Sequence, residues 1–153
     1  MAPLNADQSK RRRRLAAFTL ADPERLAEGL RQIAPEPGYV FLRRPEAGLV
    51  MVRGRIGNSG RAFNLGEMLV SRCSIQLSGR LGHGWAPGMA LLQAELAALG
   101  DALGQIPEYA PAIDGLVAEL EAEKNQREAR RRAEIKDTQV QFFTLVRGED
   151  KNA

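Results

Sequence analysis

The sequence is poor in the residues that bind transition metals or act as acid–base groups near neutral pH. It has one histidine, His83, and one cysteine, Cys73, so no disulfide can form within the chain. A structural zinc site needs four nitrogen or sulfur ligands and a catalytic site about three protein ligands, which these residues cannot supply. No pair of carboxylates stands out from the glutamates of the predicted helices. The sequence therefore predicts neither a metal site nor a catalytic residue in this chain.

Both of these residues also have a structural explanation. Cys73 falls on the apolar face of a predicted strand, so we expect a buried thiol and not a reactive one. His83 stands between Gly82 and Gly84 near the end of a strand, with no evident group to orient its ring. An independent enzyme that uses His83 as an acid or base is therefore one alternative, with a structural histidine as the favoured one.

Arginines could form a binding site for anions on the predicted sheet. Arg53, Arg55 and Arg72 fall on the polar faces of strands that can pair with each other. A guanidinium binds phosphate or carboxylate through two parallel hydrogen bonds, so these residues could contact an anion or an acidic loop of a partner. Plain exposure to solvent is the other explanation, and the pattern does not decide between them.

A second basic cluster runs from Lys10 to Arg14, within a chain of net charge +3. It could be a solvated start of a helix, a nucleic-acid-binding patch, or a docking strip for an acidic partner. Aromatic residues for base stacking are missing around it, apart from Phe18. Solvent exposure is the favoured interpretation, and a small basic nucleic-acid-binding module is the alternative function.

The elements that position these residues predict an α+β fold. Alternating apolar residues indicate strands, period-3.6 apolar residues indicate helices, and all the helices precede or follow one uninterrupted run of strands. We expect an antiparallel β-meander flanked by N-terminal helices and two C-terminal helices, with a final C-terminal strand. The predicted helices cover residues 8–19, 23–33, 89–103 and a segment from 111, and the predicted strands cover residues 39–42, 49–56, 68–77, 80–85 and 140–146.

The chain of 153 residues has the length of one domain. We expect a frayed N-terminus over residues 1–9, a single domain over 10–148, and a tail over 149–153. Its apolar runs are far shorter than the roughly 20 residues that span a bilayer. The apolar run after the basic cluster is too short for a signal peptide, so the cytoplasm is the expected compartment.

The C-terminal part of the sequence is suited to contact with other proteins. Residues 121–134 have almost no apolar side chain larger than alanine, so they predict an exposed polar helix, and an arm over residues 121–148 that engages partner subunits is one interpretation of this segment. The following strand is apolar on both faces and must be covered, either by this domain's own sheet or by a partner. The predicted interface residues are Val140, Phe142, Phe143, Leu145, Val146 and Arg147.

Three segments together resemble the PhnG family, a subunit of the bacterial carbon–phosphorus lyase core complex. They are the block Phe63-Asn64-Leu65-Gly66-Glu67, the block Gly82-His83-Gly84-Trp85-Ala86-Pro87-Gly88, and the terminal block Phe142-Phe143-Thr144-Leu145-Val146-Arg147-Gly148. The order and separation of these blocks, and the length of the chain, are similar to those of the family.

The resemblance implies a role in phosphonate catabolism. Family members assemble with PhnH, PhnI and PhnJ into a symmetric complex, with which PhnL and PhnK associate. The complex is required to displace adenine from ATP with a phosphonate, which yields α-D-ribose 1-methylphosphonate 5-triphosphate. The resemblance implies no cofactor in this subunit, since the iron–sulfur cluster and S-adenosylmethionine belong to PhnJ. A structural role in assembly is the expected contribution of this chain.

Overall fold

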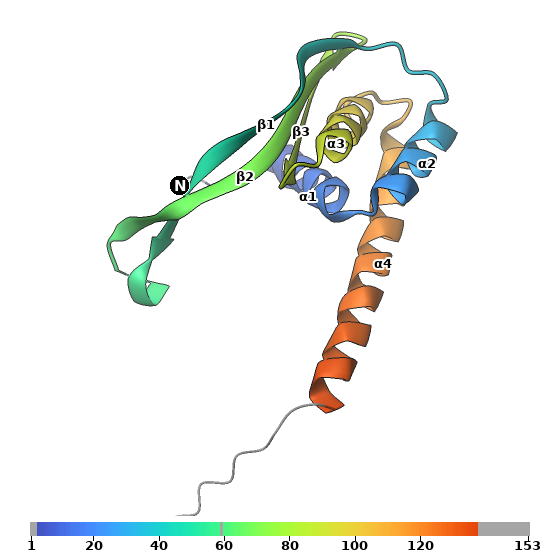
Figure 1. Ribbon diagram of the computed structural model, residues 1–153. Coiled ribbons are helices and arrows are strands. Elements are labelled where there is room, and N and C mark those ends of the chain that lie inside the picture. The colour runs from blue at the N-terminus through green and yellow to red at the C-terminus, as the bar shows by residue number, and fades with distance from the viewer. Residues whose placement is uncertain (1–2, 59, 138–153) are drawn as a thin grey trace, which may run out of the picture.

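The computed structural model describes residues 3–58 and 60–137. In this part of the chain, four α-helices and one three-stranded antiparallel sheet form the α+β fold that the sequence predicts (Figure 1). The elements are α1 (Ala6–Leu20), α2 (Pro23–Ile33), β1 (Val40–Arg55), a 3-10 turn η1 (Ile56–Asn58), β2 (Ala62–Leu77), β3 (Arg80–Pro87), α3 (Leu91–Leu103) and α4 (Ala110–Asp137). The predicted final strand, residues 140–146, lies outside the described residues.

The sheet is a meander with strand order β1-β2-β3. Strand β3 pairs with the second half of β2 only, from Val70 opposite Pro87 to Leu77 opposite Arg80. Strand β1 pairs with β2 over almost its full length. Residues 48–69 therefore form a two-stranded extension, here called the β-ribbon, which projects from the body of the domain (Figure 1).

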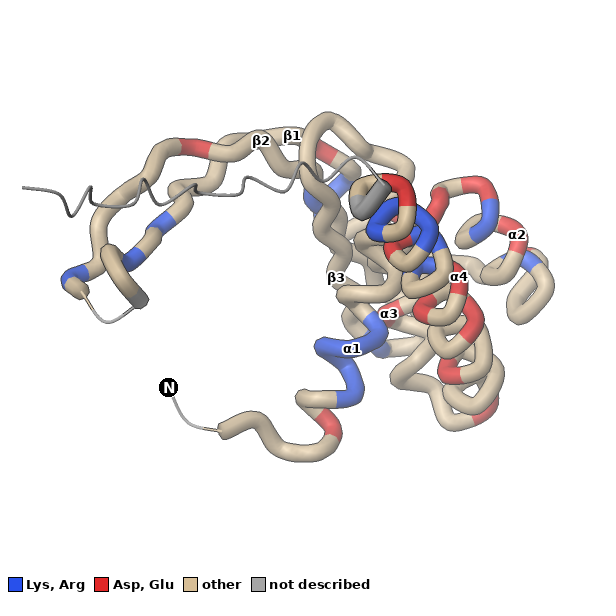
Figure 2. Tube along the Cα trace, turned by 90° about the horizontal axis from the view of Figure 1, so that it is seen from below, with Lys and Arg blue, Asp and Glu red and all other residues tan. Residues whose placement is uncertain are grey.

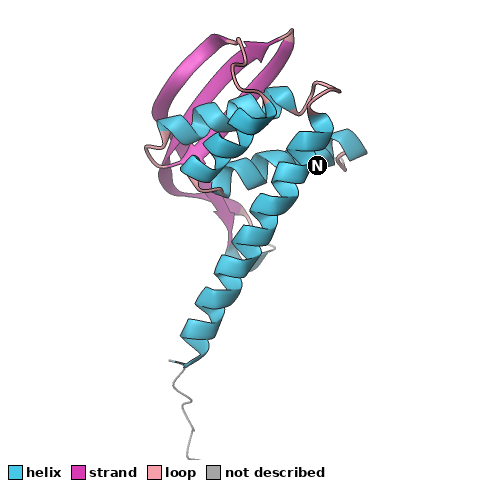
Figure 3. Cartoon of the chain, turned by 90° about the vertical axis from the view of Figure 1, so that its right-hand side faces the viewer, coloured by secondary structure: helices cyan, strands magenta, loops and turns pink. Residues whose placement is uncertain are grey.

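The core lies between one face of the sheet and the helices (Figure 3). Helix α3 packs directly on the sheet, and α1, α2 and α4 pack around α3. The core is mostly aliphatic, as the low aromatic content predicts; its largest fully buried apolar side chains are Phe18, Leu26, Leu30, Ile75, Leu103, Ile113 and Val117. Within residues 3–58 and 60–137, no helix lies on the other face of the sheet (Figure 3).

The contact between α3 and β3 depends on glycines. A Cβ atom added to Gly84 would overlap the carbonyl oxygen of Ala94, and one added to Gly82 would overlap that of Ala98. The face of α3 toward the sheet is accordingly made of alanines. Leu92, one of the apolar residues whose period-3.6 spacing predicts this helix, is 58% exposed. Small residues on both elements let the backbones approach more closely than leucine would allow.

Helix α1 begins two residues before the predicted start at residue 8. Asn5 is the N-cap and accepts a hydrogen bond from the backbone N–H of Gln8, while the side chain of Gln8 accepts one from the backbone N–H of Asn5. This reciprocal capping box satisfies two backbone donors that a helix start leaves open. The basic cluster consequently lies in the middle of α1, away from the positive end of the helix dipole.

Strand β1 is continuous where the sequence predicts two strands separated by a turn at Pro45. Its register with β2 shifts on either side of Arg43, between Phe41 and Glu46. Proline is tolerated here because β1 is an edge strand and Pro45 lies within the register shift, where the regular hydrogen bonding with β2 is already interrupted. The predicted turn is an irregularity within one long strand.

Helix α4 is buried at its start and exposed beyond Glu121. Ile113, Leu116, Val117 and Leu120 are buried, as the periodicity predicts. The second half of α4 extends past the other elements (Figures 1 and 3), which confirms the predicted exposed polar helix. In the described part of the chain, no helix is long and apolar enough to cross a membrane.

Candidate protein-binding surface

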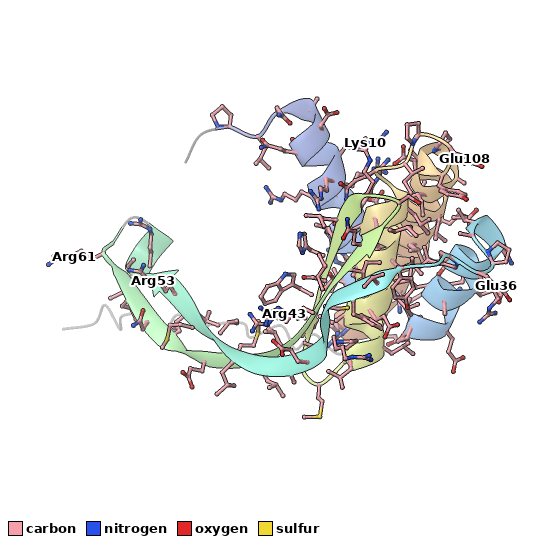
Figure 4. The ribbon with its side chains drawn as sticks, turned by 90° about the horizontal axis from the view of Figure 1, so that it is seen from above. Lys10, Glu36, Arg43, Arg53, Arg61 and Glu108 are labelled. Carbon is pink, nitrogen blue, oxygen red and sulfur yellow. The ribbon has the colours of Figure 1, made fainter. Side chains whose placement is uncertain are left out.

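Arg53 and Arg55 lie near the tip of the β-ribbon (Figure 4). Residues alternate between the two faces of a strand, so both arginines share one face of β1. Nη1 of Arg55 donates a hydrogen bond to the carbonyl oxygen of Gly60, 3.1 Å away. Among the described residues, neither arginine has a carboxylate partner. These two guanidiniums are available to an anion or to an acidic partner.

Arg72 does not join the two arginines at the tip. It lies opposite Glu46, with Nη2 of Arg72 2.8 Å from Oε1 of Glu46, and its guanidinium lies 5.9 Å from the centre of the Trp85 ring. Glu46 and Arg53 are seven positions apart on β1, which corresponds to about 23 Å along a strand. The three arginines that the sequence grouped together therefore belong to two separate places on the sheet.

Glu46 pairs with two of the basic residues at the base of the β-ribbon. It accepts hydrogen bonds from Arg43 and from Arg72 at 2.6 and 2.9 Å. These hydrogen bonds, from Arg43 first and Arg72 second, hold the pKa of the Glu46 carboxyl below its ordinary value. Arg53 and Arg55, which have no carboxylate partner among the described residues, lie toward the tip.

The β-ribbon also exposes apolar side chains. Ile56 is 73% exposed, Leu49 and Leu65 are each 62% exposed, and the remaining members of the set are exposed to a lesser degree. Lone exposed apolar residues are ordinary on a monomer, whereas a contiguous group marks an interaction site. The exposed apolar residues of the β-ribbon are Leu49, Met51, Ile56, Phe63, Leu65, Met68 and Leu69.

Backbone groups of the β-ribbon are open to partners as well. In the described structure its two strands pair only with each other, because β3 ends opposite Val70. A two-stranded hairpin in water is marginally stable on its own, and free strand edges are templates for contact with other chains. Open edges, apolar side chains and arginines therefore coincide on one projecting element.

The outer edge of β3 is protected, in contrast to the edges of the β-ribbon. The carboxylate of Asp101, on α3, accepts a hydrogen bond from the backbone N–H of His83 at 2.9 Å. The carbonyl oxygen of Leu81 accepts hydrogen bonds from Arg11 and Gln105, and that of Trp85 accepts one from Thr19. Side chains of α1 and the α3 region thus occupy the polar groups of this edge.

The basic cluster from Lys10 to Arg14 is a continuous basic stretch of α1 (Figure 2). Its ion pairs hold α1 to the domain, an arrangement that the sequence did not predict. Arg11 forms a bidentate ion pair with Asp101, whose side chain is 1% exposed. The further pairs are Lys10 with Asp114, Arg14 with Asp114 and Arg13 with Glu121. Four of the five cations are therefore paired with three carboxylates of α3 and α4, so the net charge of this group falls from +5 to +2, which removes most of the charge that the nucleic-acid alternative requires.

The two residues with catalytic potential lie in different environments. The thiol of Cys73 is 1% exposed, and burial raises its pKa to about 11, which confirms the predicted buried cysteine. His83 is exposed, and its Nδ1 lies 3.0 Å from the hydroxyl oxygen of Ser74. Residues 3–58 and 60–137 contain no group of three or more His, Cys, Asp or Glu side chains arranged to hold a metal ion.

The six predicted interface residues near the C-terminus lie outside the described residues. They are Val140, Phe142, Phe143, Leu145, Val146 and Arg147. The alternating residues of the β-ribbon were identified in the sequence, but its projection from the domain was not predicted. The signal that could have found it is the length of β1 and β2, each of 16 residues, against the 8 residues of β3.

Fold and surface together define a class: a small α+β protein with a packed core and a projecting, apolar and basic β-ribbon suited to contact with other proteins. The family model described as "Phosphonate metabolism protein PhnG" matches residues 9–148. A protein of Rhizobium meliloti (strain 1021), named α-D-ribose 1-methylphosphonate 5-triphosphate synthase subunit PhnG, is 44% identical over 119 residues, covering 77% of this chain and 76% of its relative. The chain belongs to the PhnG family of phosphonate metabolism proteins.

Proposed function

We propose that this chain is a subunit of the synthase that makes α-D-ribose 1-methylphosphonate 5-triphosphate from ATP and a phosphonate, with adenine displaced. The observation that carries the proposal is the 44% identity to a protein named as a subunit of that enzyme. The proposed role is one of assembly: the chain holds the catalytic subunits in the arrangement in which phosphonate attacks the sugar.

The projecting surfaces support an assembly role. The β-ribbon and the second half of α4 both extend beyond the packed core (Figure 1). A further group of exposed apolar residues lies at the end of β3 and the start of α3: Trp85, Met89, Leu91 and Leu92. Aromatic residues and methionine are enriched in the interfaces between proteins.

The proposed partners are PhnH, PhnI and PhnJ, in a symmetric complex with which PhnL and PhnK associate in the cytoplasm. ATP is a substrate of the complex, and the iron–sulfur cluster and S-adenosylmethionine are assigned to PhnJ. No cofactor is assigned to this chain.

Reconstitution of the synthase with and without this chain tests the proposal. We expect release of adenine from ATP to depend on phosphonate when all subunits are present, and to be lost when this chain is omitted. Restoration of activity by adding the purified chain is the matched control. Full phosphonate-dependent activity without the chain would contradict the proposed function.

A variant of His83 separates assembly from catalysis by this chain. If the chain contributes no catalytic group, the synthase that contains His83→Ala keeps its turnover rate. A large fall in turnover in a complex of normal composition would instead support the alternative in which His83 acts as an acid or base.

A further inference from the structure

One face of the β-ribbon changes from apolar to basic along its length. Strand β1 is regular up to Arg55, because the extra residue at the shift after Val52 belongs to β2. Leu49, Met51, Arg53 and Arg55 therefore follow one another on the same face. Leu49 lies opposite Leu69 near the body, Met51 lies opposite Glu67, and Arg53 lies opposite Asn64 near the tip.

The charge at the tip is not balanced within the described structure. Residues 48–69 contain three arginines, Arg53, Arg55 and Arg61, and one glutamate, Glu67, so their net charge is +2. Figure 4 shows Arg53 and Arg61 at the end of the β-ribbon, away from the helices that carry the acidic residues. In the body, Arg11, Arg14, Arg25 and Arg72 pair with carboxylates, whereas Arg80 is an exposed arginine without a carboxylate partner among the described residues. The tip is thus basic because its counter-charges are not supplied by this domain.

A second copy of this chain and the chain's own segment 138–153 both fit this face poorly. A second copy that paired ribbon to ribbon would offer the three arginines of the tip a single carboxylate, Glu67, so it would not balance their charge. A β-ribbon seated on the acidic helices of another copy would make a head-to-tail contact, which generates rings or open filaments. The segment 138–153 of this chain has two basic residues, Arg147 and Lys151, and two acidic residues, Glu149 and Asp150, so it brings no excess of negative charge.

We propose that the β-ribbon docks on another subunit of the synthase, on a surface that carries carboxylates opposite Arg53 and Arg55 and apolar side chains opposite Leu49 and Met51. This inference rests on the proposed function and adds to it the element and the chemistry of the contact. Arginine pairs with carboxylate through two parallel hydrogen bonds, which fixes register as well as affinity. The apolar half contributes the area removed from water.

The test measures binding of the full-length chain to the remaining synthase subunits, purified together without it. The double variant Arg53→Glu/Arg55→Glu reverses the charge at the tip. Arg80→Glu is the matched control, because Arg80 is exposed, lies on β3 in the body and has no carboxylate partner among the described residues. We expect the dissociation constant of the double variant to rise by about tenfold or more at low salt, and the increase to shrink as salt screens the charges.

A second pair of variants tests the apolar half. Leu49→Ser/Met51→Ser removes apolar area from the docking face, and Leu42→Ser is the matched control on an exposed position of β1 in the body. All six substituted positions are exposed, so the fold does not depend on them, and circular dichroism checks this. We expect the apolar double variant to bind at least about tenfold more weakly and Leu42→Ser to bind as the wild type does.

The outcomes separate the docking proposal from the proposed function. If both double variants bind the other subunits as tightly as the wild type does, docking through the β-ribbon is overturned and the synthase assignment stays intact. Dimerisation of the isolated chain that Arg53→Glu/Arg55→Glu abolishes would show that a second copy is the occupant, which also overturns the proposal. Failure of the wild-type chain to bind the other subunits at all would overturn both.

Discussion

Replacing Asp101 with alanine tests how α1 is attached to the rest of the domain. The carboxylate of Asp101 accepts hydrogen bonds from Nε and Nη2 of Arg11, at 2.8 and 2.6 Å, and from the backbone N–H of His83, at 2.9 Å. It thereby joins α1, α3 and the edge of β3. We expect Asp101→Ala to lower the free energy of unfolding by more than loss of the exposed ion pair between Arg13 and Glu121 does.

The size of the effect follows from the exposure of each partner. The N–H of His83 loses its acceptor in a partly buried position, which costs about 1–3 kcal/mol. The side chain of Arg11 is 39% exposed and regains water, so losing its ion pair costs only about 1 kcal/mol. The sum is about 2–4 kcal/mol, which lowers the melting temperature by roughly 4–16 °C in a domain of this size.

Chemical denaturation followed by circular dichroism measures this loss directly. Glu121→Ala is the control, because its pair with Arg13 is exposed and should leave the unfolding midpoint nearly unchanged. A double-mutant cycle of Asp101→Ala with Arg11→Ala should show coupling, since the two side chains are in direct contact. A midpoint for Asp101→Ala that equals that of Glu121→Ala would refute the view that this carboxylate holds the three elements together.

Three further outcomes follow from the packing and the ion pairs. Gly84→Val should prevent folding, because a side chain there overlaps the backbone of α3. Gly115→Ala should instead stabilise α4 by about 0.5–1 kcal/mol, because the added Cβ meets no atom within 4 Å. Thermal melting of the two variants and the wild type measures both effects. The thiol of Cys73 has a pKa of about 11, so a disulfide reagent at pH 8 should modify it only after unfolding, and rapid reaction of the native chain would contradict its burial. Burial raises the pKa of Asp114, but hydrogen bonds from Lys10 and Arg14 outweigh it, so the folded pKa lies below the ordinary value. The stability that this carboxylate contributes is therefore present above about pH 4 and lost as pH falls through the folded pKa. In an acid titration, the free energy of unfolding of Asp114→Asn should fall less with pH than that of the wild type. An equal fall in both proteins would count against the ion pairs.

Local patterns in the sequence predicted most of the elements but not every contact between them. Alternating residues predicted β2, with Cys73, Ile75 and Leu77 on the buried face, because strand periodicity is a local property. The alanine face of α3 was missed, since the reason for it lies in Gly82 and Gly84 of another element. A glycine in a strand predicts close approach of some backbone but does not say which one.

The basic cluster shows the same limit for charges. Each of its acidic partners is about 90 or more positions away in sequence, so no helical spacing could pair Arg11 with Asp101 or Arg14 with Asp114. The β-ribbon was not predicted for another reason: its residues alternate like those of any half-buried strand. In the described structure these residues project from the domain because β3, with 8 residues, pairs only with the second half of β2.

An affinity pull-down of the tagged full-length chain from its own host, grown on a phosphonate as sole phosphorus source, tests the assembly role most directly. The account predicts recovery of PhnH, PhnI and PhnJ in a constant ratio to the chain, stable in moderate salt. Recovery of the chain alone, or with nucleic acid that dissociates steeply as salt rises, would contradict the assignment as a synthase subunit.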